Sequence, residues 1–80
     1  MALIKFYAAA RQFAKQREIE VMISNKDELF SELNNVGSSQ LTKLAEISTF
    51  LINGKRFSLD EINEIRNSDV IEMLPPFAGG

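Results

Sequence analysis

The C-terminal segment Leu74-Pro75-Pro76-Phe77-Ala78-Gly79-Gly80 constrains this 80-residue chain more than any other part of it. Because proline lacks a backbone N–H and cannot continue a central strand, the paired prolines predict that a sheet releases the chain there. At roughly 3.3 Å per residue, residues 75–80 would reach about 20 Å from the body. The sequence therefore predicts a folded domain over residues 1–74 and a flexible C-terminal tail over residues 75–80.

The two terminal glycines predict a function for this tail. Gly79 and Gly80 have no Cβ, so a slim tip with a terminal carboxylate can enter a narrow site on another protein. A frayed terminus or an expression scar could also end in two glycines. The Pro-Pro pair that follows a strand-like run makes such a coincidence much rarer. We therefore predict that Gly80 presents a carboxylate to a partner.

Composition excludes most side-chain catalysis. The chain has no Cys and no His, which removes disulfides, thiol nucleophiles, Cys/His metal sites and serine–histidine triads. A net charge of −2 argues against nucleic-acid binding, and no apolar stretch is long enough to span a membrane. No Gly-rich loop is present for a nucleotide phosphate, and capping and solvation explain the acidic Asp60, Glu61 and Glu64 better than a metal does. We expect this chain to bind no cofactor or metal.

The charge is unevenly distributed along the chain. Residues 1–17 carry Lys5, Arg11, Lys15 and Arg17 and no acid, whereas acids predominate afterwards. A basic start is also typical of a mitochondrial transit peptide, but the alternating residues at the start indicate a strand that belongs to the fold. We therefore predict a cytoplasmic protein. Arg11 is expected to contact an acidic site on a partner, with an ordinary surface arginine as the alternative.

Apolar periodicity predicts a sheet around one main helix. The helix is expected over residues 26–35, capped by Ser24 with Asp27 and ended by Gly37, and a shorter helix follows Ser38 or Ser39. Residues 8–15 are expected to form a loop with a short helical turn, and Ile62 and Ile65 a brief helical or turn segment. An Asn-Gly pair at 53–54 predicts a tight turn. Strands are predicted at 2–7, 18–23, 49–52, 55–59 and 70–74.

Strand alternation also predicts two different faces of the sheet. Ile4, Phe6, Ile71 and Met73 are expected to face the core. The opposite, open face would carry an apolar patch suited to partner binding, unless the register slips by one residue and inverts the faces. Its expected members are Leu3, Tyr7, Met22, Leu51, Val70 and Leu74.

The element order β-β-α-(α)-β-β-β resembles the β-grasp, or ubiquitin-like, fold, an α+β mixed sheet with one main helix on one face and a protruding Gly-Gly tail. Residues 69–80 are similar to the C-terminus of the molybdopterin synthase small-subunit family: an acidic turn, an apolar strand, Pro-Pro, two residues and Gly-Gly. Residues 6–13 match the strand-Ala-x-x-Arg opening of that family. The chain departs from the family at Lys15, where glycine is common, and in a longer 56–65 segment.

This resemblance implies a sulfur-carrier cycle at Gly80. A ubiquitin-activating-like adenylyltransferase would use ATP to adenylate the Gly80 carboxylate, and sulfide from a desulfurase or rhodanese-type donor would replace AMP to leave a thiocarboxylate. The molybdopterin synthase large subunit would then receive the tail and transfer the sulfur to cyclic pyranopterin monophosphate. The chain would be the sulfur-donating subunit of a transferase and not an enzyme alone. Partner contacts are expected from Leu74, Pro75, Pro76, Phe77 and Gly79, together with Arg11.

Further expectations follow from the same fold. Parallel pairing of the first and last strands, as in β-grasp folds, would set Lys5 near Glu72 as a solvated surface pair and Tyr7 near Leu74. Three alternative functions remain open: a sulfur carrier for thiamine, tRNA thiolation or amino-acid synthesis; a ubiquitin-like modifier joined to lysines through Gly80; and a non-covalent β-grasp interaction module. The Pro-Pro-x-x-Gly-Gly end favours the molybdenum-cofactor pathway, because thiamine carriers are usually shorter and lack Pro-Pro.

Overall fold

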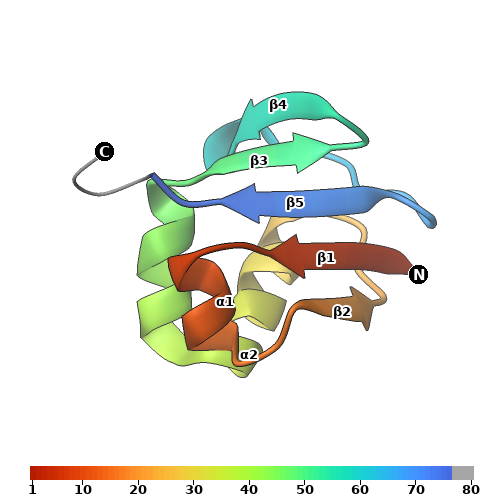
Figure 1. The fold of residues 1–80 in the computed structure, drawn as a ribbon. Helices are drawn as coiled ribbons and strands as arrows, with labels where there is room; N and C mark the ends of the chain where they lie inside the picture. Colours follow the sequence, from red (N-terminus) through yellow and green to blue (C-terminus); the bar gives the residue numbers. More distant parts are fainter. Residues whose placement is uncertain (77–80) are drawn as a thin grey trace.

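The computed structural model describes residues 1–76, which form a five-stranded mixed sheet in the order β2-β1-β5-β3-β4 (Figure 1). The long helix α2 packs across one face of this sheet, and the short helix α1 lies against α2. This is the predicted α+β, β-grasp architecture. Along the chain, the elements are β1 (Ala2–Phe6), α1 (Ala9–Ala14), β2 (Glu18–Val21), α2 (Lys26–Glu46), β3 (Thr49–Ile52), β4 (Lys55–Ser58), the 3₁₀ helix η1 (Leu59–Glu61) and β5 (Val70–Leu74).

The central strands β1 and β5 run parallel and form the middle of the core. Ile4 pairs with Ile71 and Phe6 pairs with Met73, and all four side chains are fully buried beneath the helices. Their inward orientation was predicted from alternation and is confirmed. The same register places Lys5 opposite Glu72, as expected. Burial of these side chains against Leu29, Leu33 and Leu41 of α2 supplies much of the hydrophobic stabilisation.

Helix α2 is longer than predicted and contains a kink. It runs from Lys26 to Glu46, with non-helical backbone angles at Ser38 (φ 58°, ψ −162°), where two helical halves meet. The predicted second helix is therefore present. The first half ends next to Gly37, as predicted, but the positive φ at the break falls on Ser38. Gly37 is buried and packs so closely against Leu41 that a Cβ at position 37 would lie 2.5 Å from the Leu41 Cβ.

The N-terminus of α2 is capped one residue later than predicted. The Asn25 side chain accepts a hydrogen bond from the backbone N–H of Glu28 (2.9 Å), and the Asn25 carbonyl accepts one from Leu29 N–H (3.0 Å). The Glu28 carboxylate in turn accepts bonds from the backbone N–H and the hydroxyl of Ser24 (2.7 and 2.9 Å). Ser24 therefore donates hydrogen bonds to Glu28 but is not the N-cap residue. Asp27 does not complete a capping box.

The β3–β4 hairpin turns at Asn53 and Gly54, as predicted. Both residues have positive φ values (52° and 86°), which suit an Asn-Gly pair. The Asn53 side chain also accepts a hydrogen bond from Val70 N–H (2.9 Å) and donates one to Asp69 (2.8 Å). This asparagine therefore joins the hairpin turn to the start of β5.

The segment between β4 and β5 differs from the prediction in one detail. The helical turn covers Leu59–Glu61 and ends before Ile62, while Ile62 and Ile65 are buried outside it. The Glu61 carboxylate accepts a hydrogen bond from Ser58 N–H (2.8 Å), and this bond lowers the pKa of Glu61. Glu61 therefore has the capping role that the sequence indicated.

We predict opposite effects of substitutions at the two residues of the kink. Gly37→Ala should lower the free energy of unfolding by about 1–3 kcal/mol, because its methyl group would overlap Leu41 in a packed core. Ser38→Gly should raise it by about 1 kcal/mol, because glycine adopts the observed backbone angles without strain. Urea denaturation followed by circular dichroism measures both. Equal effects of the two variants would contradict this account of the kink.

Candidate functional site

The candidate site is the edge of the sheet at which β5 ends. Because β1 is parallel to β5, the residues that follow β1 lie at the same edge as Leu74. Strand β3 is antiparallel to β5 and begins there, with Thr49 opposite Leu74. Figure 1 shows the C-terminal end of α2 beside this edge as well. We call this region, formed by Tyr7, Arg11, Thr49, Leu74 and Pro75, the exit edge.

The structure places the predicted site residues at the exit edge as far as it describes them. Leu74 is half-buried on the open face, Pro75 is buried and Pro76 is exposed. Leu74 is the last residue of β5, so the sheet releases the chain where the Pro-Pro pair predicted. Residues 77–80, with the predicted roles of Phe77, Gly79 and Gly80 and the predicted flexibility of the tail, lie outside the described residues and stay predictions.

Tyr7 holds the open-face carboxylate of the last strand. Its hydroxyl donates a 2.6 Å hydrogen bond to Oε2 of Glu72. This bond, supported by partial burial and by the negative charge of Glu72, raises the pKa of Tyr7 above its ordinary value of 10.0. Lys5 lies opposite Glu72 in the strand register, as predicted, but no ion pair joins the two side chains among the described residues. The hydrogen-bond partner of the Glu72 carboxylate is instead the hydroxyl of Tyr7, two residues after Lys5 on the same face of the sheet.

Basic side chains gather on the β1 side of the exit edge. Arg11 is exposed, and its Nε lies 3.4 Å from the Phe6 carbonyl oxygen, to which it donates a hydrogen bond. The Phe6 N–H donates to the Arg17 carbonyl (2.8 Å), which brings Arg17 back beside β1. A small hollow of ≈ 160 Å³ is lined by Lys5, Arg11 and Arg17, with Phe6, Tyr7 and Glu18. We call Lys5, Arg11 and Arg17 the basic rim; the sequence showed the charge asymmetry but not this convergence.

The open face of the sheet is mixed in character and is not a continuous apolar patch. Leu3, Leu51 and Val70 are half-buried there, as predicted, but strand pairing sets charged residues among them. Lys5 lies between Glu18 and Glu72, Leu3 is opposite Glu20, and Leu51 is opposite Arg56. Met22 is 80% exposed and lies beyond the end of β2, so it does not join this face.

Comparison with known proteins supports the fold. No sequence-family model and no curated protein sequence matches the chain. Among solved structures, it is similar to a Pyrococcus furiosus protein provisionally described as molybdopterin converting factor, subunit 1, with a TM-score of 0.71 and 23% identity over 95% of this chain and 97% of that one. It is also similar to SAMP1 from Haloferax volcanii, with a TM-score of 0.76 and 20% identity over 99% and 98% of the two chains.

These likenesses show that the chain has the β-grasp, ubiquitin-like fold over nearly its whole length. Within residues 1–76, no helix has the length and apolar character needed to cross a bilayer. The same residues contain no group of three or more carboxylates arranged to hold a metal ion. The acids of the 60–64 segment instead contact other groups: Asp60 approaches Lys26 (3.9 Å), and Glu64 pairs with Arg66 (3.3 Å).

We predict that Tyr7→Phe lowers the free energy of unfolding at pH 7 by about 0.5–1 kcal/mol, the range for one partly exposed hydrogen bond. The hydrogen bond requires a protonated phenol, and the pKa of Tyr7 is raised in the folded protein. Its contribution is therefore fully present below pH 10.0 and is lost as the pH rises through the raised pKa. Urea denaturation between pH 7 and 11 should show a steeper alkaline loss for the wild type than for the variant. Parallel profiles would contradict the Tyr7–Glu72 bond.

Proposed function

We propose that this protein is a sulfur carrier, the small subunit of a molybdopterin synthase. The observation that carries the proposal is that the chain leaves the sheet after Leu74, at the end of β5 in a β-grasp domain. The sequence continues from there as Pro75-Pro76-Phe77-Ala78-Gly79-Gly80. The similarity to a structure described as a molybdopterin converting factor subunit supports the choice of pathway. The proposal requires Gly80 to carry the α-carboxylate.

The chemistry at Gly80 begins with two substitutions. The carboxylate attacks the α-phosphorus of ATP on an activating enzyme, which forms an acyl-adenylate and releases pyrophosphate. A thiol reductant releases sulfide from the persulfide of a desulfurase or rhodanese-type donor. This sulfide then attacks the carbonyl carbon, and the bond to the AMP oxygen breaks. The product is a C-terminal thiocarboxylate. In the large subunit, its sulfur attacks a carbon of cyclic pyranopterin monophosphate and displaces an oxygen substituent there. Water then cleaves the bond between this sulfur and the acyl carbon of Gly80, which returns Gly80 to a carboxylate.

In this scheme, the residues of this chain bind the partner proteins and position the tail, and groups of the partner proteins catalyse the reactions. The sequence has neither a thiol nor an imidazole, so activation of ATP and transfer of sulfur depend on groups of the partner proteins. The half-buried Leu74 and the exposed Pro76 lie where the tail leaves the body, beside the basic rim. A partner that receives the tail therefore meets apolar and basic groups together, which suits an acidic border around its tunnel.

We predict that deletion of Gly80, or addition of one residue after it, abolishes formation of the thiocarboxylate while the thermal denaturation midpoint stays unchanged. The reason is that the reacting carboxylate would stand at the wrong distance from the partner's site. The protein is incubated with a ubiquitin-activating-like adenylyltransferase, ATP and a sulfide donor, and its intact mass is measured. A full oxygen-to-sulfur mass gain in the truncated protein would exclude Gly80 as the sulfur-bearing residue.

The same measurement separates the alternatives. A thiocarboxylate that supports no molybdopterin formation with a large subunit indicates a carrier for another sulfur pathway. An adduct linked to lysine indicates a ubiquitin-like modifier. An unchanged mass under all conditions indicates a non-covalent interaction module.

We also predict that Leu74→Asp weakens binding to the large subunit at least about tenfold, whereas Val70→Asp has little effect on binding. Both residues are half-buried on the open face of β5, at opposite ends of the same strand, so the pair is matched for local environment. Phe77→Ala is expected to behave like Leu74→Asp. Isothermal titration calorimetry measures the affinity, and differential scanning calorimetry measures stability. Equal loss of affinity at positions 70 and 74 would show that the exit edge is not the docking point.

A further inference from the structure

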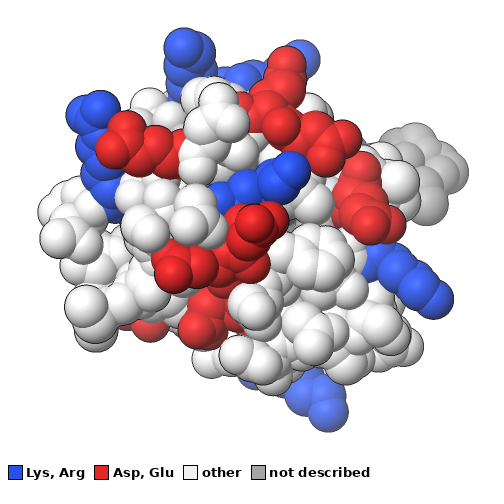
Figure 2. All heavy atoms as spheres, turned by 180° about the vertical axis from the view of Figure 1, so that it is seen from behind, with Lys and Arg blue, Asp and Glu red and all other residues white. Residues whose placement is uncertain are grey.

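Acidic side chains dominate the side of the molecule that carries the helices. Figure 2 shows this side, with acidic side chains spread across it and basic ones mostly at its margins. Helix α2 and η1 together carry six acids: Asp27, Glu28, Glu32, Glu46, Asp60 and Glu61. The helix-bearing side therefore differs in charge from the basic rim at the exit edge.

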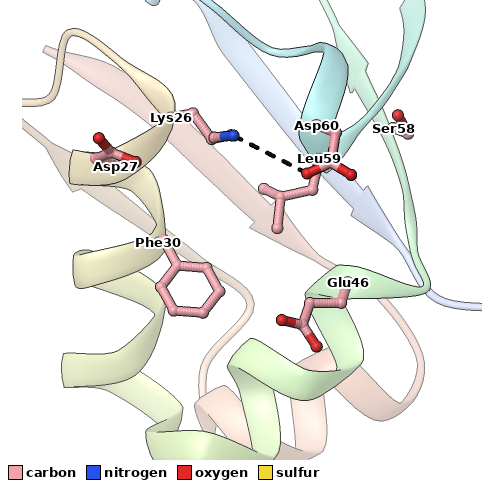
Figure 3. A pocket seen from close by; sticks show the side chains of 7 residues that line it. All are labelled: Lys26, Asp27, Phe30, Glu46, Ser58, Leu59 and Asp60. Atoms are coloured by element: carbon pink, nitrogen blue, oxygen red, sulfur yellow. Dashed lines mark ion pairs between the residues drawn. The ribbon is translucent and has the colours of Figure 1, made fainter.

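The kink in α2 builds a groove on this side. A straight helix would place Lys26 and Glu46, the two ends of α2, about 30 Å apart. In this protein both residues line one cavity of ≈ 550 Å³, because the helix changes direction at Ser38. Residues 58–60 line the side of the cavity that the two ends of α2 leave open (Figure 3). The volume falls within the range of pockets that hold ligands.

The groove has an apolar floor and a charged border. Phe30 is half-buried, Leu59 is buried, and both point into the groove in Figure 3. Three carboxylates and a single ammonium group belong to its lining, which leaves a net charge of −2. The acids are Asp27, Glu46 and Asp60, and the base is Lys26.

One cation already lies in this groove. Lys26 Nζ reaches across from α2 to Oδ1 of Asp60, 3.9 Å away, with side-chain exposures of 38% and 96%. Within residues 1–76, Glu46 and Asp27 form no ion pair. Glu46, whose side chain points into the groove in Figure 3, is thus available to a second cation above the apolar floor.

We propose that this helix-face groove binds a segment of a partner protein in which an arginine or lysine adjoins an apolar side chain. The apolar group lies on Phe30 and Leu59, and the cation lies between Glu46 and Asp60. Charge complementarity selects this occupant, because an acidic segment would be repelled by the net negative border. The proposal is independent of the chemistry at Gly80, since no groove residue belongs to the tail.

Two matched probes test the chemistry of the occupant. The ¹⁵N-labelled full chain is titrated with N-acetyl-leucyl-arginine amide and, separately, with N-acetyl-leucyl-glutamate amide, and backbone amide shifts are followed by NMR. The arginine peptide should give saturable shifts at Lys26, Phe30, Glu46 and Leu59, and these should weaken as NaCl is added. The glutamate peptide should bind about fivefold more weakly or not at all, which is the effect of one partly screened charge.

Charge reversal on this protein provides the second arm. Glu46→Lys should weaken the arginine peptide about fivefold or more and should not impair folding, because a cation at the last residue of α2 is favourable for the helix dipole. Glu20→Lys makes the same change of charge on the exposed face of β2, opposite Leu3, and should leave binding unchanged. Deletion of Gly80 should also leave it unchanged, which separates this site from the proposed function.

Four results would overturn the proposal. Absence of saturable shifts with the arginine peptide would show that the groove holds no such segment. Equal affinity for both peptides, or equal effects of the two charge reversals, would show that charge does not select the occupant. Shifts at the groove that change on dilution without any peptide would assign it to a second copy of this chain.

Discussion

The parallel pairing of β1 with β5 is the interaction on which the rest of the structure depends. It joins the first and last strands of the chain at the centre of the sheet, and it buries Ile4, Phe6, Ile71 and Met73 against α2. Because the two strands run in the same direction, the end of β1 and the end of β5 lie at one edge. The basic residues that follow β1 and the prolines that follow β5 are neighbours for this reason alone.

The fold separates charge in space as well as in sequence. Lys5, Arg11 and Arg17 converge at the exit edge, while the acids of α2 and η1 lie on the helix-bearing side. The open face of the sheet combines half-buried apolar residues with pairs of opposite charge. The described part of the chain thus has three chemically distinct surfaces: the basic rim, the helix-bearing side and the open face of the sheet.

The sequence predicted the strands well and the long helix less well. Val70–Leu74 and the Asn53-Gly54 turn were identified because alternation, proline and the Asn-Gly pair each act locally. Both halves of α2 were predicted as separate helices, but the kink that joins them at Ser38 was not, because it depends on the close contact between Gly37 and Leu41. The point where the chain leaves the sheet could be predicted from the prolines. The Tyr7–Glu72 bond and the groove could not, because they join residues distant in the chain.

The attachment of β5 at both of its flanks affects how the domain responds to force. At its start, Val70 N–H is held by Asn53, and the carbonyl of Asp69 accepts a bond from Leu3 N–H (2.9 Å). Because β1 and β5 are parallel, traction on the C-terminal side of β5 against the N-terminal side of β1 loads their hydrogen bonds in shear, all at once. Peeling would instead break them one by one. A pull between the start of β1 and the end of β5 is therefore resisted by the whole central strand pair.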